Sequence, residues 1–192
     1  MSTKGIVKGI ISNLVIVEVD GPVSQNEIAF IIEPDTKLMS EVIKVVGKNT
    51  YIQVFESTRG VKVGDPVEFA GHMLEVTLGP GILSRNYDGL QNDLDKMDGV
   101  FLKRGDYTYA LNDDKLWDFK PLAKPGEKVI AGSWLGEVDE NSKSHKIMVP
   151  FAFSGEYTVK SVIAAGQYKI TDTVAVLINS DGEEIAVTMI QR

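Results

Sequence analysis

Two histidines are the only imidazole groups in this chain of 192 residues, and it contains no cysteine. His72 and His145 lie 73 positions apart in the chain. A histidine-rich metal site and a thiolate metal site are therefore both excluded, and the sequence predicts no metal ligand. We expect each imidazole to be structural or simply exposed, although histidine can titrate near neutral pH.

Motifs for nucleophilic catalysis and phosphate binding are also missing. No serine stands in a Gly-x-Ser-x-Gly elbow, and acidic pairs such as Asp113-Asp114 and Glu183-Glu184 lie beside turn residues, where loop charges are usually solvated. Gly79-Pro80-Gly81 lacks the Gly-x-x-x-x-Gly-Lys-[Ser/Thr] spacing that cradles nucleotide phosphates. We predict no catalytic residue and no cofactor-binding residue in this chain.

A lysine on a hairpin is the remaining feature that could carry a chemical modification. The glycine spacing from Gly126 to Val138 indicates a tight two-strand corner of a flattened β-sandwich, the architecture of biotinyl and lipoyl carrier domains. Those domains modify one lysine framed by Met-Lys-Met or Asp-Lys-Ala, a frame that neither Lys143 nor Lys146 has. An autonomous carrier-type or small-molecule-binding β-protein is therefore the alternative function, and it predicts a mass increment at one of these lysines.

Composition narrows the class of protein. Hydrophobic residues make up 43% and charged residues 24%, which is typical of a globular protein. A net charge of −7 argues against nucleic-acid binding, which normally requires a basic face. The start of the chain lacks the apolar core of a signal peptide, and no apolar run approaches the roughly 18 residues of a membrane span. We expect a soluble, cytoplasmic protein without direct membrane insertion.

The first 70 residues alternate between apolar and polar positions. In the segment 14–19 all three valines face one side, whereas the other side ends in Glu18, and Gly47-Lys48-Asn49 predicts a hairpin turn. Strands are predicted at Gly5–Ile11, Leu14–Val19, Glu27–Ile32, Leu38–Val46, Thr50–Phe55 and Val67–Phe69. Short strands separated by turns favour an all-β fold with a small closed barrel, which removes exposed strand edges.

The stretch 77–91 joins the two β-regions. Gly79-Pro80-Gly81 predicts a rigid backbone reversal, because proline fixes φ and glycine adopts conformations closed to other residues. Leu90, Leu94 and Met97 have a spacing that predicts a helix of two or three turns starting near Asp88. Extended structure is predicted at Met73–Leu78, Gly99–Gly105 and Tyr107–Leu111. After Trp117 the β-pattern returns, with strands predicted at Ile147–Val149, Glu156–Ile163 and Val174–Asn179 of a second β-sandwich.

Five motifs in a fixed order carry a family resemblance. They are Thr58–Pro66 (TRGVKVGDP), Leu78–Leu83 (LGPGIL), Tyr87–Gln91 (YDGLQ), Trp117–Pro121 (WDFKP) and His145–Pro150 (HKIMVP). Together they resemble the catalytic A subunit of V-type and archaeal-type rotary ATPases over nearly the whole chain. One local departure is Asn92-Asp93-Leu94, where that family usually has Arg-Pro-Leu.

The resemblance implies a division of the chain into four parts. These are a six-stranded β-barrel at 1–70, a connecting segment at 71–114 that belongs to the nucleotide-binding core, a barrel-sandwich bulge domain at 115–180 and a return strand at 181–192. Gly79, Pro80, Gly81, Asp88 and Gly89 match the family motifs and are expected to be structural. The family's P-loop and catalytic glutamate lie beyond the matched positions, so we interpret the chain as an N-terminal piece of a longer subunit.

The resemblance also implies a function and partners. The chain would be an assembly region that helps to organise a ring of A and B subunits and contacts the peripheral stalk. The parent subunit would hydrolyse or synthesise ATP as Mg-ATP, coupled to proton or sodium transport, in a cytoplasmic sector peripheral to the membrane. Side chains of the connecting segment that would pack on the core are expected to be exposed or recruited elsewhere, namely Leu78, Ile82, Leu83, Leu90, Leu94 and Phe101.

Overall fold

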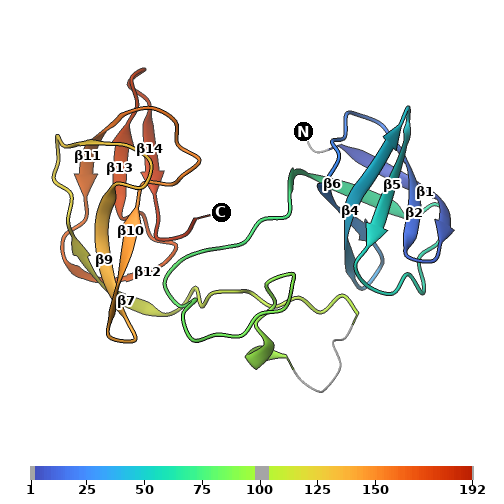
Figure 1. The fold of residues 1–192 in the computed structure, drawn as a ribbon, viewed down its shortest axis with the longest axis horizontal. Coiled ribbons are helices and arrows are strands. Elements are labelled where there is room, and N and C mark those ends of the chain that lie inside the picture. The colour runs from blue at the N-terminus through green and yellow to red at the C-terminus, as the bar shows by residue number, and fades with distance from the viewer. Residues whose placement is uncertain (1–2, 98–103, 192) are drawn as a thin grey trace. The chain divides into compact units, whose positions relative to one another are not determined.

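The computed structural model describes residues 3–97 and 104–191. Within these ranges the regular structure is almost entirely β, which confirms the expected all-β class (Figure 1). The chain divides into two compact units. The first comprises Met1–Glu75 and Asp98–Tyr107, and the second comprises Val76–Met97 and Thr108–Arg192. The residues predicted to form the connecting segment are therefore shared between the units.

The first unit is a closed barrel, as predicted. Around the barrel the strands follow the order β1-β2-β5-β4-β3-β6, and neighbouring strands are antiparallel. Their bounds are β1 Lys4–Ile11, β2 Leu14–Val19, β3 Glu27–Ile32, β4 Lys37–Val46, β5 Asn49–Val54 and β6 Pro66–Met73. The predicted turns are present: Ser12 (φ 59°) joins β1 to β2, and Gly47 (φ 60°) joins β4 to β5.

The alternation in β2 decides which face enters the barrel core. Val15 and Val17 are completely buried and Val19 is 9% exposed, whereas Glu18 is exposed and pairs with Lys8 at 2.6 Å. Fully burying a valine side chain stabilises a fold by roughly 1.5–3 kcal/mol, so the three valines strongly oppose a slip of one residue in register.

A short segment, residues 104–107, is bound to the barrel by side-chain hydrogen bonds. The Tyr107 hydroxyl donates to Glu56 Oε1 (2.6 Å) and accepts from the Met39 backbone N–H (2.9 Å). Gly105 N–H donates to Glu56 Oε2 (2.6 Å). Burial and the bond to Glu56 raise the pKa of the Tyr107 phenol well above its ordinary value. Gly105 has φ 72°, and a Cβ there would lie 1.6 Å from Thr36 Oγ1, so only glycine fits.

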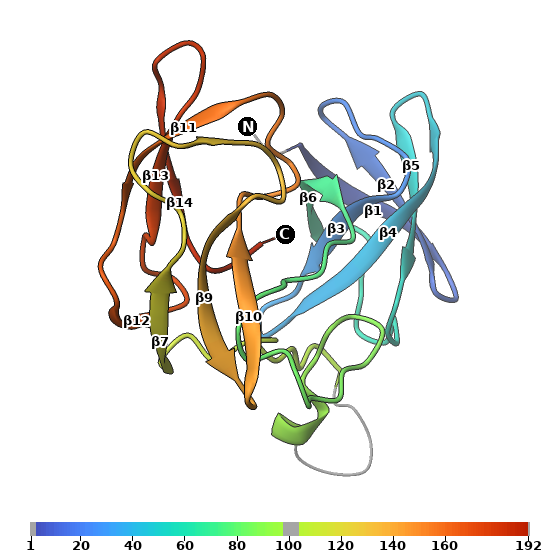
Figure 2. The same cartoon turned by 60° about the vertical axis from the view of Figure 1, so that its left-hand side comes forward.

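The second unit contains two four-stranded sheets. Their orders are β10-β9-β7-β12 and β14-β13-β11-β8. The strands are β7 Leu116–Pro121, β8 Lys128–Val129, β9 Trp134–Glu140, β10 Lys143–Met148, β11 Tyr157–Val162, β12 Gly166–Lys169, β13 Ala175–Ile178 and β14 Glu184–Val187. Figure 2 shows β9 and β10 side by side as one hairpin. Its two-residue turn, Asn141 (φ 54°) and Ser142 (φ 63°), has the left-handed conformation that suits strand twist.

Two hydrophobic clusters form the core of this unit. One is centred on Leu135 and Leu177, and the other on Phe119 and Ile170, all fully or almost fully buried. Gly136, within the glycine pattern seen in the sequence, lies under the Phe119 ring: a Cβ at this position would be 2.2 Å from Phe119 Cζ. This close approach explains the glycine.

The helix predicted from Asp88 is wrong. The only helical residues described in this region are the 3₁₀ turn η1, Leu94–Lys96. Gln91 has φ 61°, which an α-helix cannot contain, and the Asp88 side chain bonds the backbone N–H groups of Leu90 and Asn92. Local side-chain bonds of this kind compete with helix formation. The apolar spacing of the leucines was therefore misleading.

Other predicted segments differ in extent. The strand expected at Met73–Leu78 stops at Met73, where β6 ends, and no strand is formed by Tyr107–Leu111. The strand expected at Ile147–Val149 starts earlier, at Lys143, because the two-residue turn places Lys143 opposite Glu140. Most of the predicted segment Gly99–Gly105, together with Phe101, lies outside the described residues. Residues 184–187, in the predicted return strand, pair with β13 of the sandwich.

Candidate functional site

The Gly79-Pro80-Gly81 loop lies against the interior of the second unit. Gly79 and Pro80 are buried, and a Cβ on Gly79 would lie 3.1 Å from both Leu111 Cδ1 and the Met189 carbonyl oxygen. Gly81 has φ 106° and faces the Trp117 ring, which is 3.5 Å from the Cβ position. Both glycines are thus required by close approach or by backbone conformation.

A buried carboxylate at the end of β9 holds this loop. Glu140 is 2% exposed, and its Oε1 accepts hydrogen bonds from Gly81 N–H (2.8 Å) and Leu83 N–H (2.9 Å). The other oxygen, Oε2, lies 2.6 Å from His145 Nδ1 on β10. A buried carboxylate is tolerated only when it is paired and hydrogen-bonded, and here both oxygens are engaged. His145 therefore has a structural role, as expected, whereas His72 is exposed.

Asp88 organises the next part of the segment. Its Oδ1 accepts from Leu90 N–H (2.9 Å) and Asn92 N–H (2.8 Å), and its Oδ2 accepts from Asn92 Nδ2 (2.8 Å). Burial alone would raise the pKa of Asp88, but these hydrogen bonds outweigh it and lower the pKa below its ordinary value. Gly89 is exposed, and nothing lies within 4 Å of a Cβ built there, so the structure gives no reason for glycine at this position.

Further polar contacts close residues 77–91 into a loop and attach it to residues 108–110. The Gln91 side chain bonds both backbone groups of Thr77, at 2.6 and 2.7 Å. Asn92 Oδ1 accepts from Thr108 N–H (2.9 Å), and the Tyr87 hydroxyl donates to the Ala110 carbonyl (2.8 Å). Burial, followed by the charge of Asp93, raises the pKa of Tyr87. Of the sequence-derived motif residues, Gly81 and Asp88 take part in this polar network.

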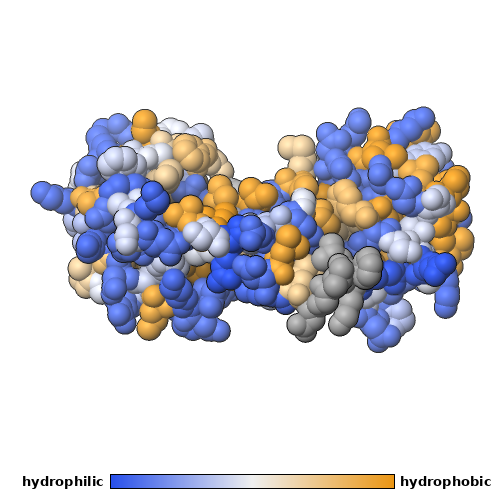
Figure 3. Space-filling model, turned by 60° about the horizontal axis from the view of Figure 1, so that its bottom comes forward, coloured by the Kyte–Doolittle hydropathy of each residue, from blue (hydrophilic) through white to orange (hydrophobic). Residues whose placement is uncertain are grey.

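The apolar side chains of this segment differ in exposure. Leu78, Leu83 and Leu94 are 48%, 40% and 41% exposed, whereas Ile82 packs against the core cluster that contains Phe119. The space-filling view shows hydrophobic side chains reaching the surface among hydrophilic ones (Figure 3). Exposed apolar groups that are close in sequence favour association with another surface.

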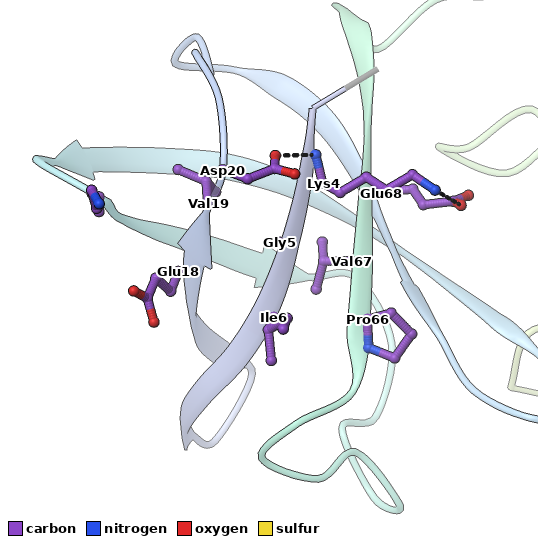
Figure 4. A pocket seen from close by; sticks show the side chains of 10 residues that line it. Lys4, Gly5, Ile6, Glu18, Val19, Asp20, Pro66, Val67 and Glu68 are labelled. Atoms are coloured by element: carbon purple, nitrogen blue, oxygen red, sulfur yellow. Dashed lines mark hydrogen bonds and ion pairs between the residues drawn. The ribbon is translucent and has the colours of Figure 1, made fainter. Parts of the chain in front are cut away.

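A groove on the barrel lies along β1, β2 and β6. Its volume is about 570 Å³, and the exposed side chains of Ile6 and Pro66 supply its apolar part. Figure 4 shows these side chains beside a charged rim. In this rim the Lys4 ammonium group lies near the Glu68 carboxylate, and the backbone N–H of Lys4 donates to Asp20 Oδ1 (2.9 Å). Ile6 is 49% exposed although it belongs to a regular strand. An apolar centre with a charged rim is the usual anatomy of a protein–protein contact.

The two lysines of the carrier alternative lie on β10. Lys143 is exposed beside the hairpin turn. Lys146 forms an ion pair with Glu137 and lies over the Trp134 ring, 4.9 Å from its centroid. These contacts restrain Lys146 and leave Lys143 as the only one of the two placed like a carrier lysine.

Two further features are absent from the described residues. Within residues 3–97 and 104–191, no three His, Asp or Glu side chains gather as a metal ion would require. In the same ranges no helix combines the length and the apolar character needed to cross a bilayer.

Sequence reasoning did not single out Glu140, which is buried, or Glu56 and Tyr107, which are partly buried. Apart from the contact of Glu140 with His145, the side-chain hydrogen bonds of these residues reach partners at least 49 positions away in the chain. The sequence offered one signal of buried polar residues in this region. Asn92-Asp93 departs from the residues that the resembled family usually has there, and both side chains are buried.

Comparison with known proteins gives a consistent result. A family model described as "ATP synthase alpha/beta family, beta-barrel domain" matches residues 7–71, and one described as "ATPsynthase alpha/beta subunit barrel-sandwich domain" matches residues 108–192. The V-type ATP synthase alpha chain of Borrelia garinii subsp. bavariensis is 45% identical over 98% of this chain and 33% of its own length. That of Treponema denticola is 44% identical over 97% of this chain and 32% of its own length. The chain thus spans about a third of the length of these relatives.

Proposed function

Because both of its domains belong to the ATP synthase alpha/beta family, we propose that this chain is the N-terminal assembly region of the catalytic A subunit of a V/A-type rotary ATPase or ATP synthase. The resemblance seen in the five sequence motifs is confirmed by the relatives, which are V-type ATP synthase alpha chains. The observation that carries the proposal is the closed six-stranded barrel followed along the chain by a barrel-sandwich unit, the same order as the two family domains.

In this proposal the barrel helps to organise a ring of alternating A and B subunits. A closed barrel has no free strand edge, so it offers a rigid contact surface without inviting strand addition. The groove along β1, β2 and β6 supports a specific contact because it combines exposed Ile6 with a charged rim. The B subunit is therefore the expected partner of this groove.

The ring contact is tested by co-purification with the B subunit of the same ATPase. Ile6→Glu introduces a charge in the groove and is expected to abolish the complex. Ile43→Glu is the matched control, because Ile43 is 39% exposed on β4, which is three strands away from β1 in either direction around the barrel. A complex that survives Ile6→Glu, or that is lost equally in both variants, would contradict the assignment of this groove.

The barrel-sandwich unit is proposed to contact the peripheral stalk. Trp134 is 58% exposed at the rim of a cavity of about 400 Å³ that Leu122 and Val129 also line. Exposed tryptophans are frequent anchors of binding energy in protein interfaces. Trp134→Glu should weaken capture of the stalk subunits, whereas Leu116→Glu, at a 53% exposed position on β7, should not. Equal capture by both variants would place the stalk contact elsewhere.

The parent subunit is proposed to hydrolyse or synthesise ATP as Mg-ATP, coupled to proton or sodium transport, from the cytoplasmic side and peripheral to the membrane. The 192-residue chain by itself is expected not to hydrolyse ATP, since the sequence contains no P-loop motif. Turnover that remains with a rigorously purified chain would overturn this expectation. Intact-mass measurement tests the carrier alternative at the same time, because that hypothesis requires an added mass on Lys143 or Lys146.

A further inference from the structure

A short apolar segment after the barrel has the features of a β-strand with one free edge. Its sequence predicts a strand, since Leu74, Val76 and Leu78 are apolar and alternate with Glu75 and Thr77. In the structure the side chains of Val76 and Leu78 are 52% and 48% exposed, and neither residue belongs to a strand of the barrel or of the sandwich. The pattern is typical of a strand that needs a further partner.

Leu78 is already paired on one edge. Its backbone N–H donates to the Gln191 carbonyl, and its own carbonyl accepts from the Gln191 N–H, both at 2.8 Å, with the two residues antiparallel. The Gln191 side chain also donates to the Met148 carbonyl (3.2 Å), which helps to hold Gln191 in place. Two residues that exchange both backbone bonds form a hydrogen-bonded pair of an antiparallel sheet.

Thr77 is paired on the opposite edge, by a side chain. Gln91 Oε1 accepts from the Thr77 N–H (2.6 Å), and Gln91 Nε2 donates to the Thr77 carbonyl (2.7 Å). The Gln91 amide thus makes the two bonds that a neighbouring strand would make. Backbone groups that alternate between two edges at successive residues are typical of a β-strand, so Thr77 and Leu78 are bonded as strand residues are.

Val76 is the next residue whose backbone belongs to the Gln191 edge. Because the bonding direction alternates, its N–H and carbonyl point to the same edge as those of Leu78. Neither group has a hydrogen bond within residues 3–97 and 104–191. In an antiparallel register each step back from Leu78 matches one step forward from Gln191. The position opposite Val76 is therefore the second one after Gln191, which is the first beyond Arg192.

We propose that the segment of the parent subunit that follows Arg192 adds to this edge as an antiparallel strand. This inference rests on the proposed function, because it requires a longer chain; the residues matched here make up 33% of the Borrelia garinii relative. The first residue beyond Arg192 exchanges two backbone hydrogen bonds with Val76. The apolar side chains of Val76 and Leu78 thereby gain cross-strand neighbours, which stabilise a sheet.

The test compares amide hydrogen exchange, followed by nuclear magnetic resonance, in two chains. One is the 192-residue chain, and the other is the same chain extended by about ten residues of its own coding sequence, enough for one strand. Exchange of the Val76 amide should slow at least about tenfold in the extended chain, because a paired amide exchanges only when the pair opens. The Glu75 amide is the internal control: it belongs to the other edge, so its exchange should not change.

A disulfide gives an independent readout, since the chain contains no cysteine. Val76→Cys, combined with a cysteine at the first position beyond Arg192, should form a disulfide in the extended chain. Directly opposite residues of this kind have Cα atoms about 5.5 Å apart, within the range that a disulfide spans. Glu75→Cys with the same second cysteine is the matched control, because successive side chains of a strand point to opposite faces and this pair should not cross-link.

The outcomes separate this inference from the proposed function. Equal exchange of the Val76 amide in the two chains, or equal cross-linking of the two cysteine pairs, would overturn the strand addition and leave the proposed function intact. Slow Val76 exchange in the 192-residue chain that depends on protein concentration would also overturn it, because the added strand would then come from a second copy. A coding sequence that ends at Arg192 would overturn both.

Discussion

Removal of the Glu140 carboxylate should destabilise the second unit selectively. Glu140→Ala leaves three donors or ring atoms without their acceptor: Gly81 N–H, Leu83 N–H and His145 Nδ1. Leu83 is exposed, so its N–H regains water, whereas the other two groups are partly buried. At about 1–3 kcal/mol for each of these two groups left unpaired, we expect a loss of about 2–6 kcal/mol in the free energy of unfolding.

Glu140→Gln separates shape from charge. The glutamine amide oxygen can still accept from the two backbone N–H groups, and the amide NH₂ can donate to His145 Nδ1 once the imidazole changes tautomer, so mainly the charge assistance is lost. We expect a loss of about 0.5–1.5 kcal/mol. Glu137→Ala is the matched control on the same strand, because it also removes a carboxylate but from a partly exposed ion pair with Lys146. Its unfolding midpoint should stay close to that of the parent chain.

Urea unfolding followed by tryptophan fluorescence is the appropriate assay. Both tryptophans of the chain, Trp117 and Trp134, belong to the second unit, so the signal does not report on the barrel. Hydrogen exchange at the Gly81 and Leu83 amides should accelerate in Glu140→Ala. If Glu140→Ala unfolds at the same urea concentration as the Glu137→Ala control, or if Glu140→Gln is as damaging as Glu140→Ala, the reasoning about unpaired donors is refuted.

Three further predictions concern single groups. Tyr107→Phe removes the hydrogen bond to Glu56 and should speed hydrogen exchange in the barrel. In the parent chain, an absorbance titration at 295 nm should show that the Tyr107 phenol stays protonated well above pH 10, although the ordinary tyrosine pKa is about 10. Gly105→Ala should unfold the barrel at lower urea than Gly71→Ala by near-ultraviolet circular dichroism, because both positions have positive φ but only Gly105 lacks room for a Cβ. The folded-state pKa of Asp88 lies below its unfolded value of about 3.9, so the ionised side chain stabilises the fold above that pH, and this stabilisation is lost as the pH falls through the folded pKa. In Asp88→Asn the free energy of unfolding, measured by tryptophan fluorescence, should therefore depend less steeply on pH below about pH 4.

The conformation of residues 88–97 shows how sequence spacing can mislead. The leucines at 90 and 94 have helical spacing, but the Asp88 side chain caps Leu90 and Asn92, and Gln91 turns left-handed to reach Thr77. The Thr77 contact joins residues 14 positions apart, so its contribution has no local periodic signature. The prediction failed because local hydrogen bonds of Asp88, together with the longer-range bonds of Gln91, outweighed a weak apolar pattern.

The sequence alone determined the barrel and its orientation of side chains. The valines of β2 alternate with period 2, and turn residues such as Gly47 interrupt the strands where hairpins form, so the information is local and survives without knowledge of partners. The positive φ of Gly81 could be predicted for the same reason, because the local motif Gly79-Pro80-Gly81 indicates a backbone reversal.

Only the tertiary structure decided the polar interior. Glu140 reaches Gly81 across 59 positions, and Tyr107 reaches Glu56 across 51. A surface glutamate and a buried one have the same letter in the sequence, and what distinguishes them is whether folding brings hydrogen-bond donors to the carboxylate as water is removed. That condition depends on the packing of distant elements, because a buried charge is tolerated only where its partners are already held in place.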